Sequence, residues 1–147
     1  MEIILINNSD IPLPRKWVKG VFQFLKRDLK NKLPTKDITV VFLNPVPAKK
    51  INRAFRKKNY ATDILSFQSG NSESLGELVL CPQVLKKQAK EHGHSFKAEL
   101  SYMLIHGVLH LLGHEHEGST AAAKKKAKLM FRIQDQLFDR LCKKYDL

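Results

Sequence analysis

Residues Leu104 to Gly118 read LIHGVLHLLGHEHEG, and this apolar segment holds four of the chain's six histidines. At about 100° per residue, its leucine, isoleucine and valine side chains cover more than one face of a helix. The pattern predicts a helix from about Phe96 to Leu112 that is apolar nearly all round. Such a helix is buried in globular proteins, so we expect it in the core of the fold.

Three of these histidines have the spacing of a metal site. His106 and His110 are four residues apart, so their rings can converge on one point. Gly113 permits the left-handed conformation that ends helices, which would bring His116 toward the first two. The spacing H-x-x-x-H-x-x-G-x-x-H is that of metzincin zinc sites, and three neutral imidazoles with an open fourth position are typical of catalytic zinc. We favour this interpretation over unrelated core or surface histidines.

The other polar residues near this stretch are less specific. We expect His114 to face solvent or substrate rather than to bind the metal. Zincin peptidases carry a glutamate directly after the first histidine as general base, and here that position is Gly107. Glu99, Glu115 and Glu117 remain as candidate carboxylates for activating water. Glu99 can equally be a buried residue that bonds a neighbouring backbone group or histidine.

The rest of the chain predicts one mixed α/β domain over residues 1–147. Apolar runs and helical spacings alternate in the order β-α-β-α-β-β-α-α-α, which indicates a sheet of about four strands with about five helices and the metal-site helix in the core. The expected strands are residues 2–7, 37–44, 62–67 and 76–82, and the expected helices are about 14–31, 48–58, 82–92, 96–112 and 119–145.

Charge and composition restrict the class of protein. Lysine and arginine outnumber acids 26 to 14, for a net charge of +12, and the excess lies at the two ends of the chain. This distribution suits a polyanionic partner such as nucleic acid, although a lysine-rich surface can also serve only solubility. No apolar run approaches the roughly 20 residues of a membrane span. The first residues do not resemble a signal peptide, so we expect a cytoplasmic protein.

Three segments in order resemble one known family. HGVLHLLGHEH, from His106 to His116, is similar to the H-G-x-L-H-L-x-G-[YH]-D-H signature of the YbeY family of bacterial metal-dependent endoribonucleases, which act in ribosomal RNA maturation and ribosome quality control. Residues 51–68 resemble that family's L-N-x-x-Y-R stretch followed by T-D-V-L-S-F, and LGELVLCP at 75–82 resembles its L-G-D-I-V-I-C strand. The resemblance covers roughly residues 51–118.

The resemblance implies roles for particular residues. His106, His110 and His116 would bind one zinc ion. Arg56, which falls on the family's L-N-x-x-Y-R arginine, would face the metal cleft, where a planar guanidinium can grip a phosphate in two places. Without the resemblance, Arg56 looks like one more base on an exposed helix face.

The departures from the family pattern are small. Phe55 replaces a tyrosine, His114 takes a position often held by tyrosine, and Glu115 stands where aspartate is usual. Arg56, His114 and Glu115 form the candidate catalytic set. We expect Thr62 and Asp63, which match the family's T-D pair, to shape the entry to a strand rather than to take part in the chemistry.

Together these features predict a zinc-dependent endoribonuclease that prefers single strands. Its expected partners are single-stranded RNA, ribosomal RNA and ribosomal proteins, with no membrane. Attack by water and attack by the RNA 2′-hydroxyl are equally open. Two alternatives remain: a non-catalytic ribosome-assembly factor with a structural zinc, and a peptidase or other metallohydrolase of small substrates.

Overall fold

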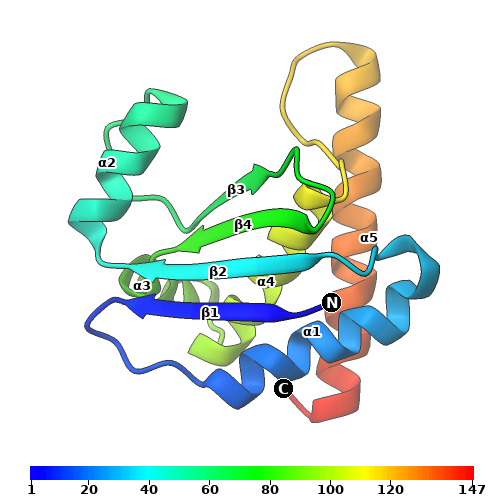
Figure 1. Cartoon of the computed structure of the whole chain (residues 1–147), viewed down its shortest axis with the longest axis horizontal. Helices are drawn as coiled ribbons and strands as arrows, with labels where there is room; N and C mark the ends of the chain where they lie inside the picture. Colours follow the sequence, from blue (N-terminus) through cyan, green and yellow to red (C-terminus); the bar gives the residue numbers. More distant parts are fainter.

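A computed structural model describes residues 1–147 and contains a four-stranded sheet in the order β1-β2-β4-β3 (Figure 1). The strands are β1 (Ile3–Asn8), β2 (Asp37–Leu43), β3 (Ile64–Gln68) and β4 (Ser74–Leu80). β1, β2 and β4 run parallel, whereas β3 pairs antiparallel with β4 at one edge. The register places Val40 of β2 between Leu5 of β1 and Leu78 of β4.

Five α-helices accompany the sheet, and their order along the chain is the predicted one. They are α1 (Arg15–Leu29), α2 (Pro45–Arg56), α3 (Pro82–His92), α4 (Phe96–Leu111) and α5 (Ala121–Tyr145), with a short 3-10 turn at Lys30–Lys32. The mixed α/β fold with a four-stranded sheet and five helices is therefore confirmed. None of the helices is long and apolar enough to cross a membrane.

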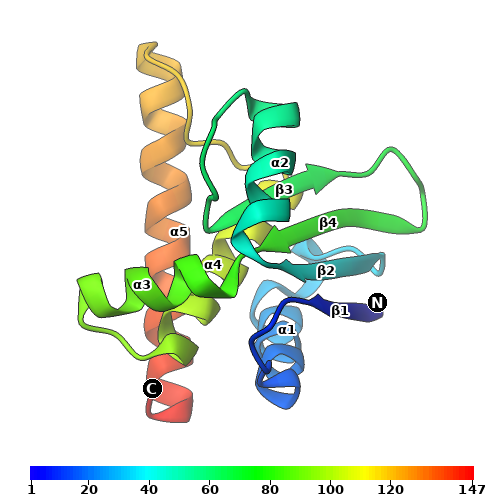
Figure 2. The same ribbon diagram turned by 90° about the vertical axis from the view of Figure 1, so that its left-hand side faces the viewer.

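Alternate strand residues face two different apolar clusters. Val40 and Leu78 belong to a core cluster of 25 buried residues that also includes side chains of α1, α4 and α5. Leu65 and Val79 point to the opposite face of the sheet, where they pack in a smaller cluster with Ala48 of α2. Helix α2 therefore packs on the face of the sheet opposite the main core cluster, and Figure 2 shows α2 at the upper end of the sheet and α1 below β1.

Helix α2 begins earlier than the sequence predicts. The sequence predicts a helix from about residue 48, but the helix begins at Pro45, and both Pro45 and Pro47 lie in its first turn. The first backbone N–H groups of a helix have no partner within it, so a proline there sacrifices no hydrogen bond.

Helix α4 lies in the core, as expected, and approaches the sheet most closely at Gly107. A Cβ atom at this position would lie 2.7 Å from Cδ1 of Ile64 in β3 and 2.8 Å from Cδ2 of Leu78 in β4. Both distances are well below van der Waals contact. The absence of a side chain at Gly107 therefore sets how deeply α4 sits against β3 and β4.

We expect Gly107→Ala to destabilise the protein although alanine is the better helix former. Overpacking a core costs about 1–3 kcal/mol, which outweighs the gain of about 1 kcal/mol in helix propensity. Gly20 in α1 is the matched control, because nothing lies within 4 Å of a Cβ there, and Gly20→Ala should stabilise by about 0.5–1 kcal/mol. Urea denaturation measures both, and equal stability of the two variants would contradict the packing argument.

Candidate metal centre

A cavity of about 910 Å³ opens beside β3 and the C-terminal end of α4. Its walls come from segments far apart in the sequence, namely the last residues of α2, strand β3, the loop after α4 and one face of α5. Figure 1 shows α2 and the N-terminal half of α5 on opposite sides of β3. The residues lining the cavity include His106, His110, His114 and His116.

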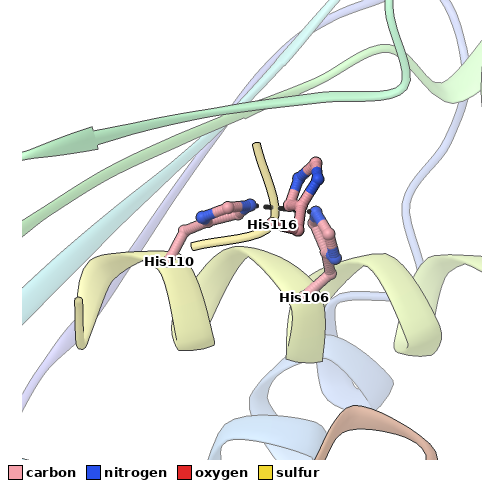
Figure 3. Close-up of side chains that lie close together, drawn as sticks. All are labelled: His106, His110 and His116. Atoms are coloured by element: carbon pink, nitrogen blue, oxygen red, sulfur yellow. Dashed lines mark hydrogen bonds between the residues drawn. The ribbon is translucent and has the colours of Figure 1, made fainter. Parts of the chain in front are cut away.

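Three histidine rings converge in this cavity (Figure 3). The Nε2 atoms of His106 and His110 are 3.1 Å apart. The ring of His116 lies over both, with centroid distances of 5.0 Å to His106 and 4.7 Å to His110. One ring nitrogen from each of the three lies within 4.8 Å of the others. The structure therefore brings together the three residues that the spacing predicted as ligands.

The turn after α4 explains how His116 reaches the helix. Gly113 has φ +99°, a conformation that favours glycine. Its N–H donates to the carbonyl of His110 at 3.0 Å, and the N–H of His114 donates to the carbonyl of Leu109, also at 3.0 Å. These two bonds form a Schellman motif. The chain then runs back over the end of α4, as expected from Gly113.

Two hydrogen bonds determine which ring nitrogens carry protons. Nδ1 of His110 lies 2.8 Å from the backbone carbonyl of His114, which can only accept, so this nitrogen donates. Nδ1 of His106 lies 2.9 Å from Oε1 of Gln134, whose amide nitrogen faces the carbonyl of Tyr102 at 3.5 Å. In the neutral rings the protons are thus on Nδ1, and both Nε2 atoms present lone pairs to each other.

The pKa values favour the same neutral forms. Burial, together with the smaller effects of the neighbouring His106 and His116, lowers the pKa of His110 to about 4. Burial also lowers the pKa of His106, against the opposing effect of its bond to Gln134. Neutral imidazole is the form that binds metal ions, so these rings are prepared to do so at neutral pH.

This donor set fits a divalent metal ion. Two nitrogens at 2.0–2.1 Å from one ion in a tetrahedral arrangement lie about 3.3–3.4 Å apart, close to the 3.1 Å observed between His106 and His110. Two lone pairs at this distance repel each other unless a cation lies between them. Imidazole suits zinc and several other transition metals, so the geometry supports a metal without identifying it.

Arg56 reaches the cavity from the last turn of α2. Nη2 of its guanidinium forms an ion pair with Oε1 of Glu117, in the loop that follows α4. Both side chains are well exposed, and the pair joins the two sides of the cavity. Asn52 holds this end of α2 in place, since its buried side chain donates to the carbonyl of Tyr60 at 2.8 Å.

The other candidate residues divide into two groups. His114 and Glu115 line the cavity, and the side chain of His114 does not belong to the three-histidine group. Glu99 lies elsewhere: its buried carboxylate is 3.2 Å from Nδ1 of His92 and accepts from Gln88 at 3.4 Å. Of the carboxylates considered as bases, Glu115 and Glu117 therefore remain in the cavity and Glu99 does not.

Sequence reasoning missed Gln134 and Phe131 of α5. Gln134 is fully buried on a stripe otherwise formed by Met130, Leu137 and Leu141. A polar residue on the apolar stripe of a helix was the signal that could have found it. The ring of Phe131 lies 5.6 Å from that of His116 and forms part of the cavity wall.

The packing at Gly107 also bears on the peptidase alternative. A glutamate here would carry the general base of zincin peptidases, but even a Cβ collides with Ile64 and Leu78. The position faces the core and not the cavity. A glutamate at this position would have to displace the terminal methyl groups of Ile64 and Leu78, and it would lie on the core side of the helix, away from the cavity.

Comparisons with known proteins agree with this architecture. A family model described as Endoribonuclease YbeY matches residues 5–142. The Endoribonuclease YbeY of Bdellovibrio bacteriovorus is 51% identical over 150 residues, covering 98% of this chain and 97% of the relative. That of Thermosipho melanesiensis is 33% identical, covering 92% and 93%. A Thermotoga maritima protein solved in solution matches with a TM-score of 0.69 at 25% identity, covering 98% of this chain and 91% of its own.

We expect Gln134→Leu to weaken metal binding while the protein remains folded. The substitution removes the acceptor that orients His106, and loss of such partners typically costs about 10–100-fold in metal affinity. Competition between the protein and a chromogenic zinc chelator measures the change. Gln136→Leu on the exposed face of α5 is the control and should bind as wild type. Equal metal affinities of the two variants would mean that the hydrogen bond to Gln134 does not orient His106 for metal binding.

We also expect the metal-free protein to lose stability as the pH falls from about 6.5 to 4. An unfolded histidine has a pKa of about 6.5, whereas that of folded His110 is about 4. In this interval the unfolded state binds more protons, so acid favours unfolding. Chemical denaturation of chelator-treated protein at several pH values measures the slope. His110→Gln should reduce it, and an unchanged slope in this variant would contradict the assignment.

Proposed function

The chain belongs to the Endoribonuclease YbeY family, and from this premise we propose that residues 1–147 form one zinc-dependent domain that cleaves single-stranded RNA. We propose the cytoplasm as its location, and ribosomal RNA maturation and ribosome quality control as the processes that it serves. Ribosomal RNA is then the principal substrate, and ribosomal proteins are further partners. The observation that carries the proposal is the convergence of three imidazoles in a cavity that also holds Arg56.

The proposed ligands are His106, His110 and His116. When bound, a zinc ion supplies a Lewis acid that polarises a phosphoryl oxygen and lowers the pKa of water. The protein's own contribution is to orient two of the three rings, because Nδ1 of His106 is bonded to Gln134 and Nδ1 of His110 to the carbonyl of His114. Because these partners are already in place, the ligands need little rearrangement to bind the ion.

Arg56 is the proposed phosphate-binding residue. Its guanidinium is permanently charged and can donate two parallel hydrogen bonds to phosphate oxygens. In the free protein the guanidinium of Arg56 is paired with the carboxylate of Glu117. A phosphate of the RNA would displace the Glu117 carboxylate from Arg56, so the two anions would compete for the same guanidinium. Arg56 would then stabilise negative charge that develops on the phosphate during cleavage.

We assign proton transfer and substrate contact to the loop after α4. Glu115 is the proposed proton acceptor, since it lines the same cavity as the three histidines. His114 lines the same cavity without belonging to the metal group, and we propose that its side chain contacts the RNA. A carboxylate here can serve attack by water and attack by the 2′-hydroxyl alike.

The charge of α2 supports an RNA substrate. The helix and the residues just beyond it carry six bases and no acid: Lys49, Lys50, Arg53, Arg56, Lys57 and Lys58. Contacts to the phosphate backbone supply much of the affinity of nucleic-acid-binding proteins and weaken with salt. A cavity that holds metal ligands also favours an enzyme over an assembly factor with a purely structural zinc.

Cleavage of a labelled single-stranded RNA tests the proposal. Wild type loaded with zinc should cleave it, and His110→Ala should lose bound metal and cleavage together. Arg56→Ala should keep its metal while cleavage falls by about 10²–10³-fold, the usual cost of removing one such charge-stabilising donor. Arg27→Ala, an exposed base on α1 outside the cavity, should differ from wild type only slightly.

Two outcomes would contradict the proposal. Equal cleavage by wild type and His110→Ala would place the chemistry elsewhere or indicate a contaminating nuclease. Metal-loaded wild type that leaves single-stranded RNA intact would favour the assembly-factor alternative.

A further inference from the structure

Phe55 is a large apolar side chain left mostly in solvent. It is 70% exposed, the highest fraction among the exposed large hydrophobic residues of the protein. It precedes Arg56 at the end of α2 and lines the same cavity. Its aromatic partner is Phe67 of β3, whose ring lies edge-on to it with the centroids 5.2 Å apart and the planes at 70°.

This contact leaves much of the Phe55 ring free. An edge-on partner orients an aromatic ring without covering it, in contrast to a stacked one. Phe67 is itself half-buried and packs against the cluster beneath α2. Phe67 therefore holds Phe55 in place at the cavity wall, while 70% of Phe55 stays accessible.

We propose that Phe55 is a stacking platform for a nucleobase of the RNA, next to the phosphate that Arg56 holds. The proposal rests on the proposed function and names the part of the substrate that this wall of the cavity recognises. Base and phosphate are adjacent groups of one nucleotide, as Phe55 and Arg56 are adjacent residues of one helix. Both residues line the same cavity, so this wall offers an aromatic surface for the base and a charge for the phosphate.

The chemistry of this wall gives a reason for single-strand preference. The bases of a duplex are stacked on one another, so their faces are not free to lie on a protein ring. Single strands can splay their bases out onto aromatic side chains. Every base has a π-face, so such a platform favours unpaired RNA without selecting a particular base. Phe55 would therefore distinguish strandedness rather than sequence.

We expect truncation of the Phe55 side chain to leave the stability of the fold nearly unchanged. Most of its surface is exposed, and exposed positions away from special contacts have small effects on stability. Phe55→Ala removes the platform, whereas Phe55→Trp keeps an aromatic face. Tyr60 is the matched control, since it is an aromatic residue 56% exposed in the segment after α2 and does not line the cavity.

The experiment measures binding and cleavage separately. A short single-stranded RNA containing 2-aminopurine is mixed with zinc-loaded protein, and the fluorescence is read on mixing, before cleavage proceeds. Stacking quenches this base. We expect wild type and Phe55→Trp to quench it and Phe55→Ala to lose the quenching and bind about 5- to 150-fold more weakly, the usual effect of removing one stacked base. Tyr60→Ala should bind as wild type.

An abasic RNA of equal length shows whether any weakening of binding in Phe55→Ala comes from lost contact with a base. It can bind only through its phosphates and sugars, so Phe55→Ala should bind it as wild type does. Equal weakening for both strands, or no weakening for either, would overturn the platform. If wild type cleaves RNA and Phe55→Ala binds normally, only this inference fails. If wild type binds and quenches the RNA but never cleaves it, the platform stands and the proposed activity fails.

Discussion

The close approach of α4 to the sheet at Gly107 is the constraint on which the rest of the structure depends. Without a side chain there, the helix settles against Ile64 of β3 and Leu78 of β4. This depth places His106 and His110 at the border between the core and the cavity, where burial keeps them neutral. A larger residue at Gly107 would have to displace the side chains of Ile64 and Leu78 or shift the helix, and a shift of the helix would move both rings relative to β3.

A second constraint follows, since buried polar groups need hydrogen-bond partners. His106 finds its partner in Gln134 of α5, and His110 finds one in the carbonyl of His114. Both partners accept, and both therefore leave the Nε2 lone pairs free. The same two hydrogen bonds give the buried Nδ1 atoms their partners and leave the Nε2 atoms free to bind a cation. They also connect α4 to α5 and to the intervening loop.

The opposite wall of the cavity, at the end of α2, is exposed rather than buried. Helix α2 lies on the other face of the sheet and packs only a small apolar cluster, so its end projects Phe55 and Arg56 into solvent. These residues are held by few contacts, namely the rings of Phe55 and Phe67 and the ion pair of Arg56 with Glu117. The wall formed by α4 and α5 thus carries the buried metal-site histidines, and the wall at the end of α2 carries exposed groups that suit a polyanion.

The sequence by itself determined the order of elements, the burial of α4 and the histidine triad, because all three rest on local periodicity, spacing and the conformation of Gly113. It could not place Gln134, which is 28 residues from His106, nor remove Glu99 from the cavity, because such contacts depend on how helices pack. Arg56 is the clearest case. Its charge and helix are readable locally, and only the family resemblance placed it at the metal cleft. The tertiary structure decides how β3 and the loop after α4 meet the end of α2, because side chains distant in sequence become neighbours only when the chain closes around a common core.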